Sequence, residues 1–165
     1  MRSRTPTVRP ENEDDRKALR MSYKIGRGEQ GVLTFEPYKS QILPLWRFRT
    51  VEIAQKSSHD LWEKFKEYDA LGDFVGMDMT RKFIQMGMTR AKRYGQRAGG
   101  RKYSKETGEE LDKSSTHKGA NEKMAASDVF REVWERCRAH EGYLEKKEAF
   151  MKEQKQYAKD QRSVQ

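Results

Sequence analysis

The sequence predicts a mainly α-helical domain with three principal helices, a short extended or β segment near the N-terminus, and a long loop before the last helix. Apolar residues recur at intervals of three and four over 50–71, 73–94 and 127–137, which places them on one helical face in each stretch, and 143–161 keeps a helical character with few large apolar residues. Prolines and glycines interrupt 23–49, while 95–126 is rich in Gly, Ser, Thr and charged residues. One small helical domain is therefore expected.

Composition limits the size of the core and sets the sign of the surface charge. The chain has 165 residues, of which 34% are apolar and 37% are charged, so a single domain with a modest core is expected. The 35 Lys and Arg outnumber the 26 Asp and Glu, and the net charge of +9 favours polyanionic partners such as DNA or RNA. No apolar run approaches the ~18 residues that cross a bilayer, and no secretory signal is evident. A cytoplasmic protein without membrane partners is expected.

The chain is expected to divide into three parts. Residues 1–21 carry mixed charge and few large apolar side chains, which is typical of a disordered tail. Residues 22–161 form the expected domain, and 162–165 form a short C-terminal tail. Within the domain, 32–35 predicts a short strand and 43–49 predicts an extended segment that carries two aromatic residues.

Capping residues mark the ends of the first two helices. Thr50 or Ser57 is expected to cap the first helix, and Gly72 is expected to end it because glycine accepts the left-handed conformation. Asp73 or Asp78 is expected to start the second helix, which is the clearest amphipathic segment of the sequence. The predicted core residues on the three helices are Trp62, Phe65, Phe83, Ile84, Phe130, Val133 and Trp134.

The third helix follows the long loop over 95–126. Ser127 is expected to be its N-cap, with Asp128 favourable in the first turn, and Gly142 is expected to kink it. Within the loop, 105–111 predicts a small turn or hairpin. A loop of this length is usually functional or mobile.

Gly26, Gly28 and Gly31 have the G-x-G-x-x-G spacing of phosphate-binding loops. A dinucleotide site needs a helix directly after the glycines, whereas here a strand-like V-L-T-F and then Pro37 follow. The sequence also contains no Gly-Lys-Ser/Thr of a P-loop and no further kinase motif. The glycines are therefore interpreted as a turn with positive φ angles, and a phosphate loop that includes Arg27 is the alternative.

The other reactive side chains predict no catalytic or metal site. The three histidines lie far apart and match no zinc motif, so no metal or other cofactor is expected. Cys137 lies on the apolar face of the third helix and is interpreted as a small core residue. Four methionines of the second helix are expected to be core residues, with an adaptable binding groove as the alternative. They are Met77, Met79, Met86 and Met88.

The main functional signal is a run of positive charge without acids. Between Met79 and Lys105 there are nine Lys and Arg and no Asp or Glu. A helix with one buried and one cationic face suits phosphate backbones, and an exposed Tyr103 can stack on a base. The alternative is a charged face that serves solubility. The candidate contact residues are Arg81, Lys82, Arg90, Lys92, Arg93, Arg97, Arg101, Lys102 and Tyr103.

Three segments also resemble a known family. They are YKIGRGEQGVLTFEPYKSQILPLWRFRT, DFVGMDMTRKFIQMGMTRAKRY and GGRKY. They are similar to a family of small proteins, described only as a domain of unknown function, that occurs in bacteria, phages and fungi. The resemblance covers most of the chain from Tyr23 onward and leaves out the first 21 residues. It implies a cytoplasmic setting and carries over no reaction and no site residue.

Three functional hypotheses follow from these observations. The first is a non-enzymatic protein that binds nucleic acid or another polyanion by its backbone, without sequence specificity. The second is a protein-interaction adaptor that uses a methionine-rich surface or the C-terminal helix. The third is a small enzyme that acts on a phosphorylated substrate held by the glycine turn.

Overall fold

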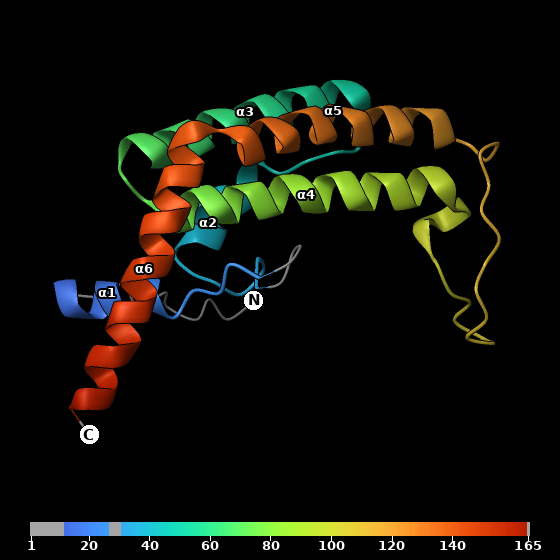
Figure 1. The fold of residues 1–165 in the computed structure, drawn as a ribbon. Coiled ribbons are helices and arrows are strands. Elements are labelled where there is room, and N and C mark those ends of the chain that lie inside the picture. The colour runs from blue at the N-terminus through green and yellow to red at the C-terminus, as the bar shows by residue number, and fades with distance from the viewer. Residues whose placement is uncertain (1–11, 27–30, 165) are drawn as a thin grey trace, which may run out of the picture.

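The computed structural model describes residues 12–26 and 31–164, and over these residues the fold is mainly helical, as predicted (Figure 1). In this part of the chain the helices are α1 (Glu13–Met21), α2 (Tyr38–Ile42), η1 (Leu43–Leu45), α3 (Val51–Ala70), α4 (Phe74–Gln96), η2 (Ala98–Gly100), α5 (Ala120–Ala139) and α6 (Glu141–Ser163). No strand occurs in the described residues, where an isolated antiparallel bridge joins Tyr103 to Glu110. None of the described helices combines the length and the apolarity needed to cross a membrane.

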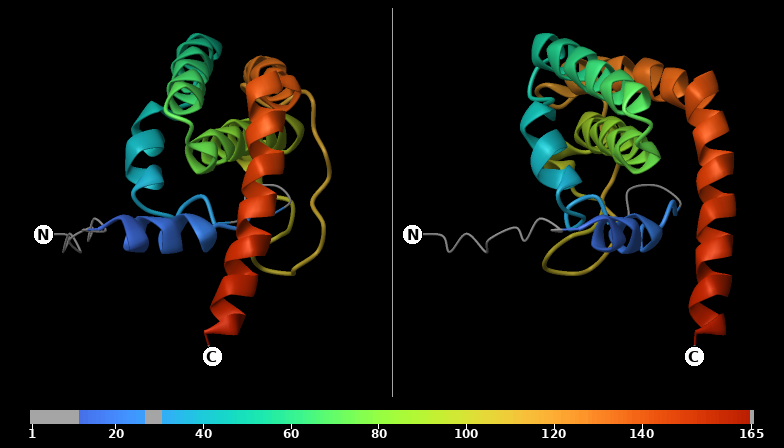
Figure 2. Two further views of the ribbon diagram at one scale, coloured as in Figure 1. Left: turned by 60° about the vertical axis from the view of Figure 1, so that its left-hand side comes forward. Right: turned by 90° about the vertical axis from the view of Figure 1, so that its left-hand side faces the viewer.

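Helices α3, α4 and α5 pack against one another as a three-helix bundle (Figure 2). The Oγ1 atom of Thr50 accepts a hydrogen bond of 3.1 Å from the amide of Ile53 and caps α3. A carboxylate oxygen of Asp73 accepts one of 3.1 Å from the amide of Gly76 and caps α4. Gly72, with a φ of 70°, makes the turn between these helices. The predicted ends of the first two long helices are therefore confirmed, with Thr50 and Asp73 as the caps.

The helical conformation is interrupted between α5 and α6 at His140, where the backbone is extended. The Nδ1 atom of His140 accepts a hydrogen bond of 3.1 Å from the amide of Tyr143 and caps α6. The predicted kink at Gly142 is thus a break just before it. The expected third helix is therefore two separate helices, α5 and α6, and the prediction of three principal helices was wrong. Gly142 lies inside α6, close to the carboxylate of Asp69. Helix α6 leaves the bundle at a steep angle and extends past α1 (Figure 2).

The N-terminal half contains helices that the sequence did not predict. Part of the expected disordered tail forms α1, which Asn12 caps by accepting a hydrogen bond of 2.8 Å from the amide of Asp15. Residues 1–11 lie outside the described part of the chain. The predicted strand is a turn instead, because the amides of Thr34 and Phe35 both donate to the carbonyl of Gly31.

The predicted extended segment and the last long loop also differ from expectation. The segment expected to be extended over 43–49 begins with η1, and only its second part lacks helical structure. Helix α5 begins at Ala120, earlier than Ser127, the predicted cap. The Ser127 side chain is buried against α4, where its Oγ donates a hydrogen bond of 2.8 Å to the carbonyl of Met88. At the other end, α6 continues to Ser163, into the predicted tail.

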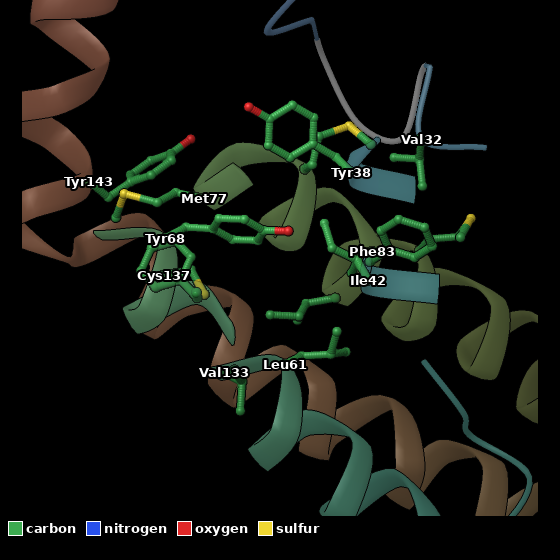
Figure 3. Packing of buried hydrophobic residues seen from close by; sticks show 14 of the residues in the cluster. Val32, Tyr38, Ile42, Leu61, Tyr68, Met77, Phe83, Val133, Cys137 and Tyr143 are labelled. Carbon is green, nitrogen blue, oxygen red and sulfur yellow. The ribbon is translucent and has the colours of Figure 1, made fainter. Parts of the chain in front are cut away.

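The core lies where α3, α4 and α5 meet and extends beneath α2 and α6 (Figure 3). Of the predicted core residues, the buried ones are Phe65, Phe83, Ile84, Phe130 and Val133, whereas Trp62 and Trp134 are partly buried. Figure 3 shows Ile42 of α2 and Tyr143 of α6 joining this core. Neither was predicted, because both come from short or polar stretches without a long apolar period.

Candidate nucleic-acid interface

Arg81 lies in the interior and not on a solvent-facing side of α4. Its guanidinium donates hydrogen bonds of 2.8 and 3.1 Å to Oδ1 of Asp78, whose side chain is fully buried. The hydroxyls of Tyr23 and Tyr143 also donate to Asp78, the second across 2.7 Å. Burial, and then the Asp78 carboxylate, raise the pKa of both tyrosines, so both remain protonated donors. This Asp78 network joins the N-terminal segment, α4 and α6.

Lys82 is also buried, beside the same network. Its Nζ donates a hydrogen bond of 2.8 Å to the carbonyl of Lys24 and lies 4.6 Å from the ring centre of Tyr23. Burial lowers the pKa of Lys82 to about 8. Placing Arg81 and Lys82 on a solvent-facing cationic side was therefore wrong. The reason is tertiary, because the N-terminal segment and α6 cover the first half of α4 on the side that the sequence assigned to water.

Arg97, just after α4, is buried and holds the following segment in place. Its guanidinium forms an ion pair of 2.9 Å with Glu110 and donates to the carbonyls of Lys102 and Leu111. These acceptors belong to a small hairpin, 101–111, which Figure 1 shows at the C-terminal end of α4, away from α6. Arg97 therefore positions the hairpin and is not an exposed contact residue, which corrects the sequence prediction. The predicted turn at 105–111 is confirmed by the bridge between Tyr103 and Glu110.

The remaining cations lie along the second half of α4 and at the start of the hairpin. We define the cationic surface by Arg90, Lys92, Arg93, Arg101, Lys102 and Lys105. Lys92 is half-buried and the other five are exposed. Within residues 12–26 and 31–164, none of the six forms an ion pair with an Asp or Glu side chain. Their charges are therefore available to a partner.

The structure adds cations that the charge pattern of the sequence did not predict. The segment 46–49 (W-R-F-R) lies beside α4, since the guanidinium of Arg90 sits 5.3 Å from the ring centre of Trp46. Arg47 and Arg49 are exposed here. Lys123 of α5 donates a hydrogen bond of 2.8 Å to the carbonyl of Arg49. Burial lowers the pKa of Lys123, and the neighbouring Glu122 carboxylate opposes this in part. The alternation of aromatic and Arg residues was the signal that could have identified this segment.

Two tyrosines stand among these cations. Tyr103, a predicted contact residue, is 54% exposed on the hairpin, and Tyr94 of α4 is 44% exposed. The Nζ atom of Lys102 lies 5.5 Å from the ring centre of Tyr103, and that of Lys123 lies 5.8 Å from the ring centre of Tyr94. Each of these two exposed rings thus has a cation beside it.

The glycine-rich stretch is described only in part. Gly26 and Gly31 have φ angles of 55° and 81°, as the turn interpretation expects, while Arg27 and Gly28 lie outside the described residues. Gly31 opens a turn, and α2 begins only at Tyr38, so no helix directly follows the glycines. The arrangement of a dinucleotide-binding helix is therefore absent at Gly31 and the residues that follow it.

A cleft of about 600 Å³ lies at the opposite end of α4, between α1, α2 and the turn that joins α3 to α4. Its walls carry charges of both signs, Arg16 and Arg20 on α1 and Asp73 and Glu153 elsewhere. The Asp73 carboxylate caps α4 and also accepts a hydrogen bond of 2.8 Å from the hydroxyl of Tyr38. The cleft is therefore a second candidate site, with no single sign of charge.

The methionines and the cysteine of the long helices belong to the interior. Met77, Met79 and Met86 are buried and Met88 is partly buried, which confirms their interpretation as core residues and leaves no methionine-rich surface on α4. Cys137 is fully buried in α5, and burial raises the pKa of its thiol to about 12. Because the thiolate is the reactive form, this cysteine is inert in the folded protein.

The fold and this site define a small helical protein with a basic surface at one end of its longest bundle helix. A family model described as "Domain of unknown function (DUF4385)" matches residues 8–153. Since the match spans most of the sequence, the chain belongs to this family, as the resemblance predicted. The match begins at residue 8, so residues 8–21 lie within the matched region, contrary to expectation. No curated protein and no solved structure gives a significant match.

Proposed function

We propose that this protein binds nucleic acid or another polyanion through the cationic surface, chiefly by contact with phosphate groups. The observation that carries the proposal is the set of six Lys and Arg side chains, from two consecutive segments, that have no acidic partner among the described residues. Neighbouring Arg81 and Arg97, in contrast, are neutralised internally by Asp78 and Glu110. The six cations of the surface, which have no such partner in the described part of the chain, are therefore able to form ion pairs with phosphate groups.

The excess positive charge of the chain is concentrated in α4 and the segment that follows it. Residues 74–119 carry 11 Lys and Arg against 5 Asp and Glu, which accounts for +6 of the net charge of +9. The hairpin itself carries both signs, because Glu106 and Glu109 are exposed on it. The three cations of α4, with Arg47 and Arg49 nearby, therefore form the centre of the proposed interface. Cations spread in this way gain affinity by releasing the counterions condensed on the polyanion.

The proposed recognition is of the backbone and not of base sequence. The sequence has no helix-turn-helix, RNP or zinc-finger pattern, and the hairpin is short and closes onto the end of α4 through Arg97. Phosphate contacts fix the position of a protein on nucleic acid but carry no sequence information. Affinity is therefore expected to depend strongly on salt and weakly on sequence.

The proposal is tested by the fluorescence anisotropy of labelled, mixed-sequence RNA and DNA titrated with the protein. If about six phosphates are contacted, affinity should fall by about 10³-fold between ~50 and ~200 mM salt. Protein purified at low salt should show a raised ratio of absorbance at 260 nm to that at 280 nm, which nuclease treatment lowers. Absence of binding to either nucleic acid at ~50 mM salt would contradict the proposal.

A second candidate function is the binding of a small phosphorylated ligand in the cleft beside α1. The observation that favours it is the volume of about 600 Å³, which lies within the range typical of ligand sites. Arg16 and Arg20 would bind the phosphate. Thermal unfolding in a panel of nucleotides and phosphorylated metabolites tests this function, because a bound ligand raises the unfolding temperature. A shift that the Arg20→Ala variant loses would support it, and no shift across the panel would contradict it.

A further inference from the structure

Tyr103 and Tyr94 are large aromatic side chains that are exposed to solvent next to cations, Tyr103 beside Lys102 on the hairpin and Tyr94 one helical turn after Arg90 on α4. Their exposed fractions are 54% and 44%, although a phenol ring is normally more favourable when buried. We propose that the cationic surface binds single-stranded nucleic acid, whose bases stack on these two rings. The inference rests on the proposed function and specifies its ligand.

The backbone of Tyr103 is held rigidly in the hairpin. On one side the amide of Ser104 donates a hydrogen bond of 2.9 Å to the carbonyl of Glu109, and on the other the amide of Leu111 donates one of 2.8 Å to the carbonyl of Lys102. Arg97 anchors the same hairpin to the end of α4. The ring is therefore exposed without being on a loose chain, so little conformational entropy is lost when a base stacks on it.

The ring of Tyr94 is held by its neighbours. It packs against Gly100, where a side chain larger than hydrogen would overlap the ring, and the ammonium of Lys123 lies 5.8 Å from its centre. Its own carbonyl contacts Nε2 of His117 across 2.7 Å, which ties the end of the long segment to α4. Tyr94 also lies one helical turn after Arg90, so a phosphate-binding cation and a stacking ring are adjacent on α4.

Exposed rings beside cations favour single strands over duplexes. The bases of a duplex are stacked on one another and cannot reach a surface tyrosine, whereas those of a single strand are free to stack on it. Stacking tolerates any base, because every base has a π face, and this agrees with an interface that lacks a sequence-reading element. Lys102 and Lys105 flank Tyr103 in sequence and can contact the phosphates on either side of the stacked base.

The test compares a single-stranded 12-mer with the duplex of the same sequence, using the wild type, Tyr103→Ala and Tyr103→Phe at constant salt. Each stacked base is worth roughly 5- to 150-fold in affinity, so Tyr103→Ala should weaken single-strand binding by about that factor. Duplex binding should change by less than about 2-fold, because the charges are untouched. Tyr103→Phe keeps the ring and should bind the single strand about as well as the wild type.

The outcomes separate this inference from the proposed function. The stacking inference is wrong if Tyr103→Ala leaves the affinity for the single strand unchanged, or lowers the affinities for single strand and duplex equally. In either case polyanion binding stands. If neither ligand binds the wild type at low salt, both are wrong. Circular dichroism of each variant verifies the fold, and Tyr94→Ala is then expected to reproduce the selective loss with a smaller effect, because its ring is less exposed.

Discussion

The hydroxyl of Tyr143, in the first turn of α6, donates a hydrogen bond of 2.7 Å to Oδ1 of the fully buried Asp78 in α4. Asp78 also receives hydrogen bonds from Tyr23 and Arg81. The N-terminal segment and α6, which are far apart in the sequence, are thus both hydrogen-bonded to one buried carboxylate of α4. Because α6 buries only Tyr143 and Phe150, this bond is a principal attachment of α6 to the bundle.

We predict that Tyr143→Phe destabilises the protein by about 1–3 kcal/mol, because a buried carboxylate loses one of its donors while the ring still fills its place. Equilibrium unfolding in urea measures the change in the free energy of unfolding. Tyr157→Phe is the control, since Tyr157 is partly exposed on the same helix, and it should cost less than ~0.5 kcal/mol. Equal costs for the two variants would show that the Asp78 network contributes little.

Gly76→Ala in α4 is predicted to destabilise the protein, although Ala normally favours a helix interior over Gly by about 0.5–1 kcal/mol. A Cβ atom at position 76 would overlap the ring of Tyr68, which packs directly on the Gly76 backbone. Overpacking of this kind costs about 1–3 kcal/mol. In a Tyr68→Ala background the same substitution should become neutral or stabilising, and a cost that persists there would show that the ring is not its cause.

The stability of the wild type should depend on pH through Lys82. Burial lowers the pKa of Lys82 to about 8, whereas in the unfolded chain this pKa has its ordinary value of ~10.4. Between these values the unfolded state holds more protons, so the contribution of Lys82 to the free energy of unfolding rises with pH and is least favourable below pH 8. From pH 7 to 9 the free energy of unfolding should rise by about 1 kcal/mol more in the wild type than in Lys82→Met.

This comparison is made by urea unfolding at several pH values, and the difference between the two proteins isolates Lys82 from other groups. Cys137 has an opposing effect above its ordinary pKa, since its folded pKa is raised to about 12, but it is present in both proteins and cancels. A difference that does not change with pH would show that the Lys82 pKa is not lowered by folding.

Local signals in the sequence were sufficient to predict the parts of the fold that depend on neighbouring residues. Thr50 and Asp73 cap their helices as predicted, and the periodic core residues Phe83 and Phe130 are buried, because capping and periodicity act within a few residues. The helix α1 and the turn after Gly31 were missed, because tertiary packing and turn chemistry outweigh weak local patterns there.

The cationic site could be predicted only in part for the same reason. The sequence located the basic run correctly, but burial of Arg81 depends on Tyr143, which follows it by more than sixty positions. Likewise, Arg97 is paired with Glu110 only because the hairpin folds back onto the end of α4. Arg49 is held near α5 by the hydrogen bond that its carbonyl accepts from Lys123. A charge pattern shows how many cations a helix carries, and only the fold shows which of them are exposed to solvent.

The most direct measurement of the central claim is the salt dependence of RNA binding by two variants of equal net charge. One replaces Arg90, Lys92 and Arg93 with Ala, and the other replaces Lys155, Lys159 and Arg162, which are exposed on α6, in the same way. For single strands, we predict that the slope of log affinity against log salt becomes less negative by about 2 in the α4 variant. The α6 variant should retain the wild-type slope. Equal slopes in the two variants would show that only total charge matters and would contradict a binding surface on α4.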